Sequence, residues 1–385
     1  MLSVKEKKKK ECCGCGQCAD ICPKSAIKMS KDSEGFLYPE VDTTSCVNCG
    51  LCVKECSFNA IEHSQYDSQS FFVCRSLNID VLENSASGGV FTHLSDRILR
   101  NNGIVFGATY DKDFSVIHKG TSDYNIRNTF RDSKYTQSNC EGIFSKVYEK
   151  LKDGHLVLFT GTPCQCAAVS RFVTRKNVDT SKLYLVDIIC HGVGSPRVWK
   201  DYLDYSKKKY KLNNIDRIIT RNKKIGDGYN LTLYSKDIQI VREDVQDPYI
   251  MLFSHNLILR PSCFACPFKT WARCTDITIG DFQKVKMYYP QFADQKGVSV
   301  VIVNTNKGNE LLGSIKDELV IVKTNKEKSS QVNLYQQIDG YEKRELFFKY
   351  FLSHSFSATL KKYTEEGFVN RLIGVTKRFI KGVVK

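Results

Sequence analysis

Two runs of cysteines near the N-terminus have the spacing of ligands to an iron–sulfur cluster. In each run, three cysteines stand three residues apart, and a fourth follows four residues later. Such spacing lets one short loop hold three corners of an iron–sulfur cube, while the fourth cysteine reaches the cube held by the other loop. We therefore predict two [4Fe–4S] clusters, the first on Cys12, Cys15, Cys18 and Cys56 and the second on Cys46, Cys49, Cys52 and Cys22.

A pair of structural zinc sites is the alternative for these runs. A structural zinc ion takes four ligands, usually as two C-x-x-C pairs, and has no use for a third evenly spaced cysteine followed by a fourth. Two details depart from the regular pattern, because Ser57 stands where the second run would usually carry a proline like Pro23, and because Cys13 adds a thiol. Neither removes a ligand. We expect Cys13 to lie beside the first cluster, although it leaves the identity of the first ligand open.

The remaining cysteines are scattered along the chain. They are Cys74, Cys140, Cys164, Cys166, Cys190, Cys263, Cys266 and Cys274. Only Cys263 and Cys266 form a local C-x-x-C pair. Such a pair with distant single cysteines could bind zinc, act as a redox pair or be buried as ordinary core thiols, and spacing alone does not decide among these.

The composition is that of a folded protein in a reducing compartment. The 385 residues include 17 cysteines, 42% hydrophobic and 26% charged residues, which excludes a wholly disordered, collagen-like or coiled-coil protein. An odd number of clustered cysteines favours metal or redox chemistry over a disulfide framework. The N-terminus lacks the apolar segment of a secretory signal, and no apolar run approaches the roughly 18 residues that span a bilayer. We therefore expect a cytoplasmic protein of two or three domains.

The elements that position these cysteines follow from the pattern of hydrophobic residues. The cysteine spacing is typical of bacterial ferredoxins, so we expect an α+β, ferredoxin-like domain at residues 1–62, followed by a linker at 63–81. From Leu82 onward strand-like and helical segments alternate, which predicts an α/β domain whose sheet is covered by helices. Helices are expected at 90–103, at 142–151, at 165–173 and after Pro196. Strands are expected at 104–110, 156–160, 183–189, 215–220, 231–234, 238–241, 276–281 and 298–303.

Three places in this second region have the character of binding sites. Ser87, Gly88 and Gly89 precede a predicted helix, where free backbone N–H groups could hold a phosphate or simply form a capped turn. Thr160 and Gly161 end one predicted strand just before Cys164, and Cys190 and His191 end the next. Ligands collect at the C-terminal ends of such strands, so two strand ends that each carry a cysteine indicate a shared site.

Six motifs, in order, resemble those of the coenzyme F420 hydrogenase/dehydrogenase β-subunit family. They are SASGG at 85–89, SKYTQS at 133–138, GTPCQ at 161–165, DIICHGVGSP at 187–196, CFACPF at 263–268 and DITIGDF at 276–282. The resemblance covers residues 82–330, as an N-terminal region at 82–160 and a C-terminal region at 161–330, and leaves 331–385 as a basic helical tail. With the ferredoxin domain in front, the arrangement resembles the electron-input subunit of F420H2 dehydrogenase. The family also includes plant 7-hydroxymethyl chlorophyll a reductase and bacterial members found beside polysaccharide biosynthesis genes, so membership does not identify the substrate.

The resemblance implies an α/β flavin-binding domain that holds FAD and a third [4Fe–4S] cluster. The ligands that it implies for this cluster are Cys164, Cys190, Cys263 and Cys266. Four cysteines then remain as free thiols, namely Cys74, Cys140, Cys166 and Cys274, of which Cys274 is the hardest to exclude as a ligand.

The resemblance also implies contacts to FAD. Ser87, Gly88 and Gly89 would lie along the cofactor, and Lys134 and Tyr135 would contact its phosphates or ring. Thr160 and Gly161 would allow close backbone approach beside the cluster, and Asp281 would either touch the flavin or order its loop. His191 could supply a proton near the flavin, although a structural hydrogen-bonding role is favoured.

These cofactors together predict an oxidoreductase. A hydride carrier delivers two electrons at once and an iron–sulfur cluster accepts one, so a flavin must stand between them. We expect coenzyme F420, NAD(P)H or an organic substrate at FAD, and a ferredoxin or a partner oxidoreductase subunit at the clusters, with either direction of electron flow. The alternative is a non-catalytic electron-relay subunit that serves a partner enzyme, such as one in polysaccharide biosynthesis.

The formal charge of +15 is partly offset by the clusters, since three would contribute roughly −6 in the oxidised state. We expect the basic run at residues 5–10 to be a solvated arm that could dock an acidic ferredoxin. A basic amphipathic helix near the C-terminus, carrying Phe368, Leu372, Val375 and Phe379 on one face, could contact an anionic membrane, although packing on protein is favoured. Nucleic-acid binding is poorly supported, because the basic residues are dispersed.

Overall fold

The computed structural model describes residues 3–59, 69–225, 231–236, 238–240 and 247–364. Its N-terminal segment is an antiparallel hairpin of β1 (Ile27–Lys31) and β2 (Leu37–Val41) with two cysteine loops. Each loop leads into a single helical turn, α1 (Gln17–Asp20) or α2 (Leu51–Lys54). Both turns begin after a glycine with positive φ, Gly16 at 88° and Gly50 at 70°, a conformation that glycine adopts without steric cost.

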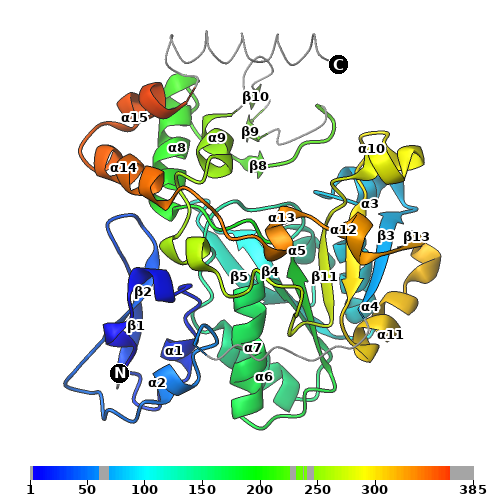
Figure 1. Ribbon diagram of the computed structural model, residues 1–385, viewed down its shortest axis with the longest axis horizontal. Coiled ribbons are helices and arrows are strands. Elements are labelled where there is room, and N and C mark those ends of the chain that lie inside the picture. The colour runs from blue at the N-terminus through cyan, green and yellow to red at the C-terminus, as the bar shows by residue number, and fades with distance from the viewer. Residues whose placement is uncertain (1–2, 60–68, 226–230, 237, 241–246, 365–385) are drawn as a thin grey trace.

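An eight-stranded mixed sheet forms the centre of the molecule (Figure 1). Its order is β13-β3-β12-β11-β7-β6-β4-β5. The strands are β3 (Ser70–Ser76), β4 (Ile104–Tyr110), β5 (Val116–Thr121), β6 (Val157–Gly161), β7 (Leu183–Ile188), β11 (Ile277–Asp281), β12 (Ser299–Val303) and β13 (Leu319–Thr324). Strands β4, β6, β7 and β11 are parallel, and the outer pairs are antiparallel.

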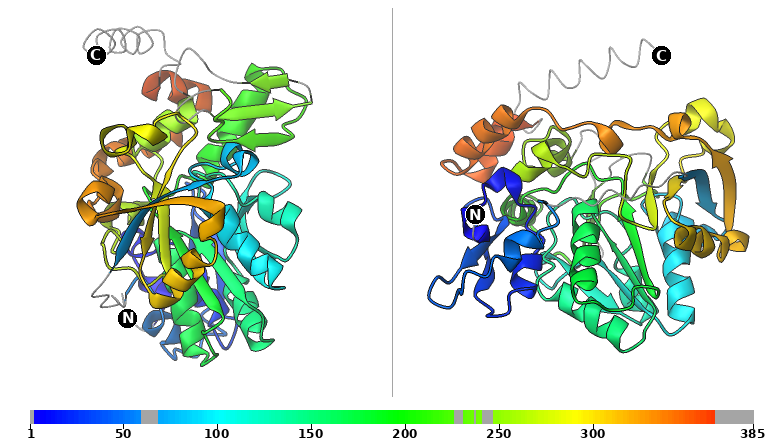
Figure 2. Two further views of the ribbon diagram at one scale, coloured as in Figure 1. Left: turned by 90° about the vertical axis from the view of Figure 1, so that its right-hand side faces the viewer. Right: turned by 60° about the horizontal axis from the view of Figure 1, so that its bottom comes forward.

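Helices cover both faces of the parallel strands, as Figures 1 and 2 show. On one face, Phe106 and Phe159 pack against α6 (Ile143–Lys152) and α7 (Pro163–Arg175). On the other face, Leu158 and Val186 pack with α4 (Val90–Arg100) and α11 (Asn306–Gly313). Adjacent residues on one strand thus face opposite layers, as the two-residue period of a strand requires, and the predicted helix-covered sheet is confirmed.

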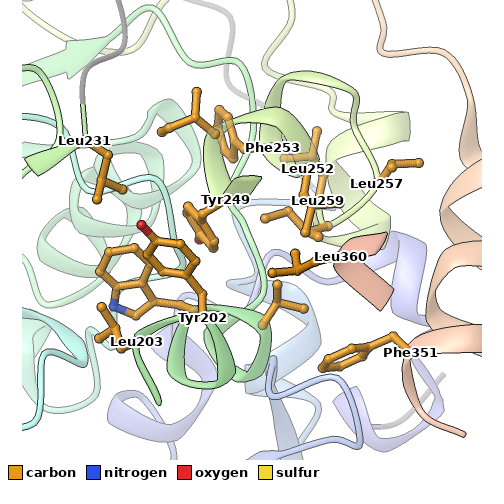
Figure 3. Close-up of a cluster of buried hydrophobic side chains, with 14 of the residues drawn as sticks. Tyr202, Leu203, Leu231, Tyr249, Leu252, Phe253, Leu257, Leu259, Phe351 and Leu360 are labelled. Atoms are coloured by element: carbon orange, nitrogen blue, oxygen red, sulfur yellow. The ribbon is translucent and has the colours of Figure 1, made fainter. Parts of the chain in front are cut away.

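A helical cluster and a small sheet complete the fold. The helices are α8 (Pro196–Lys209), α9 (Pro248–Ser254), α14 (Tyr341–Phe351) and α15 (Phe356–Tyr363), and the small antiparallel sheet has β8 (Arg217–Ile219), β9 (Thr232–Ser235) and β10 (Ile238–Ile240). Their shared core includes Tyr202, Tyr249, Leu252, Phe351 and Leu360 (Figure 3). The other short helices are α3 (Ile79–Glu83), α5 (Tyr124–Asn128), α10 (Val285–Tyr288), α12 (Lys326–Ser329) and α13 (Val332–Tyr335).

The structure corrects three expectations about chain organisation. Residues 70–76, predicted to be linker, form β3, whose Phe71, Val73 and Cys74 are buried between β12 and β13. The short apolar run FFVC at 71–74 was the missed signal. Residues 331–364 are no tail, because α14 and α15 contribute to the helical core. The expected division between residues 160 and 161 falls inside β6.

The basic run at residues 5–10 is exposed at the surface, as expected, but its lysines also contact the protein. Lys9 pairs with Asp32 at 2.6 Å, and Lys10 lies 3.5 Å from the centre of the Tyr341 ring. The basic amphipathic helix expected around Phe368–Phe379 lies outside the described residues. In the part of the chain that the structure describes, no helix combines the length and the hydropathy that crossing a membrane requires.

A buried ion pair connects the N-terminal segment to the helical cluster. Arg344 on α14 pairs with Glu34, which lies in the turn between β1 and β2, and it also donates to the Leu259 carbonyl. The side chain of Arg344 is 3% exposed and that of Glu34 is 12% exposed. The pair therefore holds segments that are 310 residues apart.

Replacing Arg344 should destabilise the protein. We expect Arg344→Met to lower the free energy of unfolding by about 3–5 kcal/mol, because it leaves the Glu34 carboxylate buried without its cation. Urea unfolding followed by circular dichroism measures this change. The neighbouring exposed Lys343 is the matched control, and Lys343→Met should stay within about 0.5 kcal/mol of the wild type; equal stability of the two variants would contradict the assignment.

Candidate functional site

The first predicted cluster site is assembled across the two cysteine runs. Burial raises the pKa of Cys18, and the nearby Cys12 and Cys56 raise it further. Lys7 donates to the Cys56 sulfur at 3.0 Å. Cys56, from the second run, therefore lies with the ligands of the first run, in the crossed arrangement that the spacing predicts.

The second predicted site is a small cavity lined by the remaining four cysteines of the two runs. These are Cys22, Cys46, Cys49 and Cys52, around a space of about 20 Å³. Cys49 is exposed, and Val47 beside it is 57% exposed. This site thus reaches the protein surface, whereas Cys12, Cys15 and Cys18 of the first site are at least half-buried.

The third predicted site brings together cysteines from three separate parts of the chain. Cys164 lies in the first turn of α7, Cys190 follows β7, and Cys263 lies with Cys266 at the short 3-10 helix Pro261–Ala265. All four line one cavity of about 40 Å³. Strands β6 and β7 are parallel neighbours, with Gly161 opposite Asp187, so the residues that follow them meet at the same edge of the sheet.

Cys13 also lines this third cavity. Hydrogen bonds from the thiols of Cys15 and Cys164 lower the pKa of Cys13, so its sulfur lies between a ligand of the first site and a ligand of the third. From the sequence, Cys13 was expected beside the first cluster, but its place in the lining of the third site was not foreseen. The adjacent pair Cys12–Cys13 was the only available signal, because the third site is assembled by tertiary contacts.

The chemistry of the third cavity fits an anionic iron–sulfur cluster. Burial raises the pKa of Cys190 to about 12, so a bound metal or a cation must stabilise its thiolate. Lys269 donates to the Cys190 carbonyl at 2.9 Å and lines the cavity together with Arg260. No three His, Cys, Asp or Glu side chains of the described residues meet at a single ion-sized point.

A larger cavity of about 410 Å³ lies next to the third site. It opens at the C-terminal ends of β6, β7 and β11, and the start of α4 contributes to its wall. The two cavities share Thr162, Gln165, Cys190, His191, Gly192, Val193 and Asn333. The third cysteine site and the large cavity are therefore separated by a single layer of residues.

The large cavity collects most of the residues predicted to contact FAD. Ser87, Gly89, Lys134, Tyr135, Thr160, Gly161, Asp281 and His191 line it. Gly88 does not: a Cβ there would lie 2.4 Å from the Cys74 carbonyl oxygen, and its N–H donates to the Ser299 hydroxyl. Gly88 thus allows the α4 loop to pack on the sheet, while Gly89, with φ of 84°, begins the helix at the cavity.

Two charged residues predicted to meet FAD already have protein partners. The Lys134 ammonium donates to the carbonyls of Thr129, Arg131 and Asp132, and burial lowers the pKa of Lys134 to about 8. Asp281 pairs with Arg221, which also lines the cavity. Arg221 carried no recognisable sequence signal. The Asp281–Arg221 ion pair therefore forms part of the cavity wall.

Both ring nitrogens of His191 are engaged in hydrogen bonds. The Asn256 amide nitrogen donates to the Asp339 carbonyl, so its oxygen faces His191 Nε2, at 2.7 Å. Nδ1 lies 3.1 Å from the Asn333 amide oxygen; because a neutral imidazole donates from only one ring nitrogen, the Asn333 amide must turn its nitrogen toward Nδ1 when the ring is neutral. Burial lowers the pKa of His191. A neutral imidazole held by two amides supports the structural role rather than proton supply.

Residues 154–329 match the family described as the C terminus of the beta subunit of coenzyme F420 hydrogenase/dehydrogenase, and residues 11–60 match the 4Fe-4S dicluster domain. The predicted resemblance is confirmed, and the chain joins an iron–sulfur domain to a region of an oxidoreductase family.

A solved structure with a similar chain is that of the F420-reducing [NiFe] hydrogenase complex from Methanosarcina barkeri, in its xenon derivative. The two chains are 16% identical with a TM-score of 0.48, over 73% of this chain and 91% of the other. A TM-score below 0.5 adds no argument to the family match. No curated protein matches this chain significantly.

A buried histidine supports the cavity of this β-subunit region. His118 donates from Nε2 to the Thr160 carbonyl at 3.1 Å, and its Nδ1 lies 3.2 Å from the Cys140 sulfur. Burial lowers the pKa of His118 to about 4. The ring therefore stays neutral near pH 7 and orients the end of β6.

This histidine should make stability sensitive to acid. Between pH 6.5 and about 4 the unfolded chain binds a proton that the folded chain does not, so stability falls as the pH falls. We expect the free energy of unfolding of the wild type to be about 2 kcal/mol lower at pH 5 than at pH 8 because of His118. In His118→Gln this decrease should be correspondingly smaller. Urea unfolding at both pH values measures the difference. The exposed His354→Gln is the control, and the idea fails if both variants show the same pH dependence.

Proposed function

We propose that this chain is an iron–sulfur flavoenzyme. It would move electrons between a hydride carrier or organic substrate at FAD and one-electron carriers at three [4Fe–4S] clusters. FAD exchanges two electrons with a hydride carrier and single electrons with iron–sulfur clusters, which is the chemistry that these groups would supply when bound. The observation that carries the proposal is the shared wall between the large cavity and the cavity of Cys164, Cys190, Cys263 and Cys266.

The residues of the shared wall have definable tasks. The capping box of Thr162 and Gln165 fixes the first turn of α7 and with it Cys164. His191, held between two amides, fixes the chain that follows Cys190. Thr160 and Gly161 present backbone and a small side chain to the large cavity, so a planar ring could approach the cluster site closely.

The second cluster site, which is the end of the proposed electron path farthest from FAD, lies at the surface. The second cysteine site includes exposed Cys49 next to exposed Val47. A cluster there would be accessible to a separate electron carrier, which supports a ferredoxin or a partner subunit as the one-electron partner. The first site, beside the third-site residue Cys13, lies between the surface and the large cavity.

The content of iron and flavin tests the proposal. Anaerobically purified protein should contain about twelve iron atoms and one FAD per chain. Cys190→Ser should lower the iron content to about eight, because it removes a ligand of the third cluster only. Cys274→Ala, which changes a cysteine outside the predicted ligand set, should keep about twelve. Wild-type protein with eight iron atoms and no flavin would contradict the proposal.

Reduction by hydride donors separates an enzyme from a relay subunit. We expect NADH, NADPH or a reduced deazaflavin to bleach the flavin absorption of the isolated protein under anaerobic conditions, since the large cavity can admit a donor beside the flavin. Boiled protein with free FAD is the control for direct chemical reduction. If none of these donors nor any organic acceptor reacts without a partner protein, the relay-subunit alternative holds instead.

A further inference from the structure

A completely buried arginine lies between the first and third cysteine sites. Arg260 is 0% exposed and precedes Cys263 by three residues. Its Nε donates to the Cys12 carbonyl at 2.8 Å, Nη1 to the Gln137 side chain at 3.2 Å, and Nη2 to the Leu37 carbonyl at 2.9 Å. One side chain therefore joins the loop of the first site to the loop of the third.

The packing around this guanidinium leaves little freedom to either loop. Its carbon lies 4.1 Å from the centre of the Tyr38 ring. Gln137, which accepts from Arg260, also donates to the Gly14 carbonyl at 3.2 Å. At Gly14 a Cβ would lie 2.7 Å from Nη1 of Arg260 and 2.4 Å from Gln137 Nε2. The backbone around Cys12 and Cys13 is thus fixed against the third site by direct contact.

The positive charge of Arg260 has no carboxylate partner in the described part of the chain. Its three hydrogen-bond acceptors are neutral carbonyl groups. Burying an unneutralised cation is energetically unfavourable, so such a group is retained where an anion faces it. Cys12, Cys13 and Cys263 are the thiols that interact with its charge, and they belong to the first and third sites.

We propose that Arg260 is a positioning residue that holds the first and third clusters at a fixed separation and serves both as a shared counter-cation. This inference rests on the proposed function, because it requires both clusters. Reduction of either cluster adds one negative charge and forms no bond, and a cation between them lowers the free energy of that charge on both sides. Each cluster should therefore be easier to reduce with Arg260 than without it.

Removing the charge gives the first test. In Arg260→Met we expect the equilibrium constant for one-electron reduction to fall about tenfold at two of the three clusters, which is about 59 mV for one electron. Redox titration followed by electron paramagnetic resonance measures the three potentials, and the signal lost in Cys190→Ser identifies the third cluster. The second cluster serves as an internal reference, because its cavity does not include Arg260.

Lys269 provides a matched control. The thiols that interact most strongly with its ammonium are Cys190, Cys266 and Cys263, all of the third site. Lys269→Met should therefore lower the reduction potential of the third cluster alone, whereas Arg260→Met should lower the potentials of both the first and the third clusters. If both variants shift the reduction potential of the same single cluster, Arg260 is not shared by the first and third clusters, and the inference is wrong.

A charge-conserving variant tests the positioning role and remains informative should Arg260→Met not fold. Lysine keeps a cation, but one ammonium cannot reach the three separated acceptors in the fixed geometry of a guanidinium. We expect Arg260→Lys to keep about twelve iron atoms while weakening the magnetic interaction between the reduced first and third clusters. Wild-type potentials and an unchanged interaction in Arg260→Lys would overturn the inference and leave the proposed function intact. Eight iron atoms in the wild type would instead remove the proposed function itself.

Discussion

The site depends on one constraint, which is that β6 and β7 run parallel and side by side. Their register pairs Val157 with Leu183 and Gly161 with Asp187, so the residues after both strands emerge at one edge. Cys164 and Cys190 are thereby neighbours although 26 positions separate them in the chain. The C-x-x-C pair needs only to fold over that edge to close the third site, and the large cavity occupies the adjoining strand ends.

Buried cations attach the N-terminal segment to this framework. Arg344 reaches Glu34, and Arg260 reaches the carbonyls of Cys12 and Leu37. Figure 1 shows this segment beside α14, the helix that carries Arg344. Charges in such positions are costly to bury unless they are compensated, so they favour one docking arrangement over others. The first cysteine site is in this way held against the third.

Some motif residues lie at the cavity as predicted but make other contacts than the predicted ones. Gly88 and Gly89 are adjacent, yet Gly88 packs against the sheet and Gly89 faces the cavity. Lys134 has the chemistry of a phosphate ligand, but its three donors are used by carbonyls of its own loop. Residue type indicated where the cavity would be, while the local hydrogen bonds decided what each side chain does there.

The sequence by itself determined the two local cysteine runs and the main strands and helices around the cavity, since these follow from spacing and periodicity over a few residues. It could not place β3, because a strand that pairs with β12 and β13 more than 200 residues away leaves only a short apolar run in the sequence. Nor could it show that Cys13 faces Cys164, that Asp281 pairs with Arg221, or that Arg260 lies between two sites. Those relations join residues through space, and only the packing of the sheet, the loops and the N-terminal segment brings their side chains within contact distance.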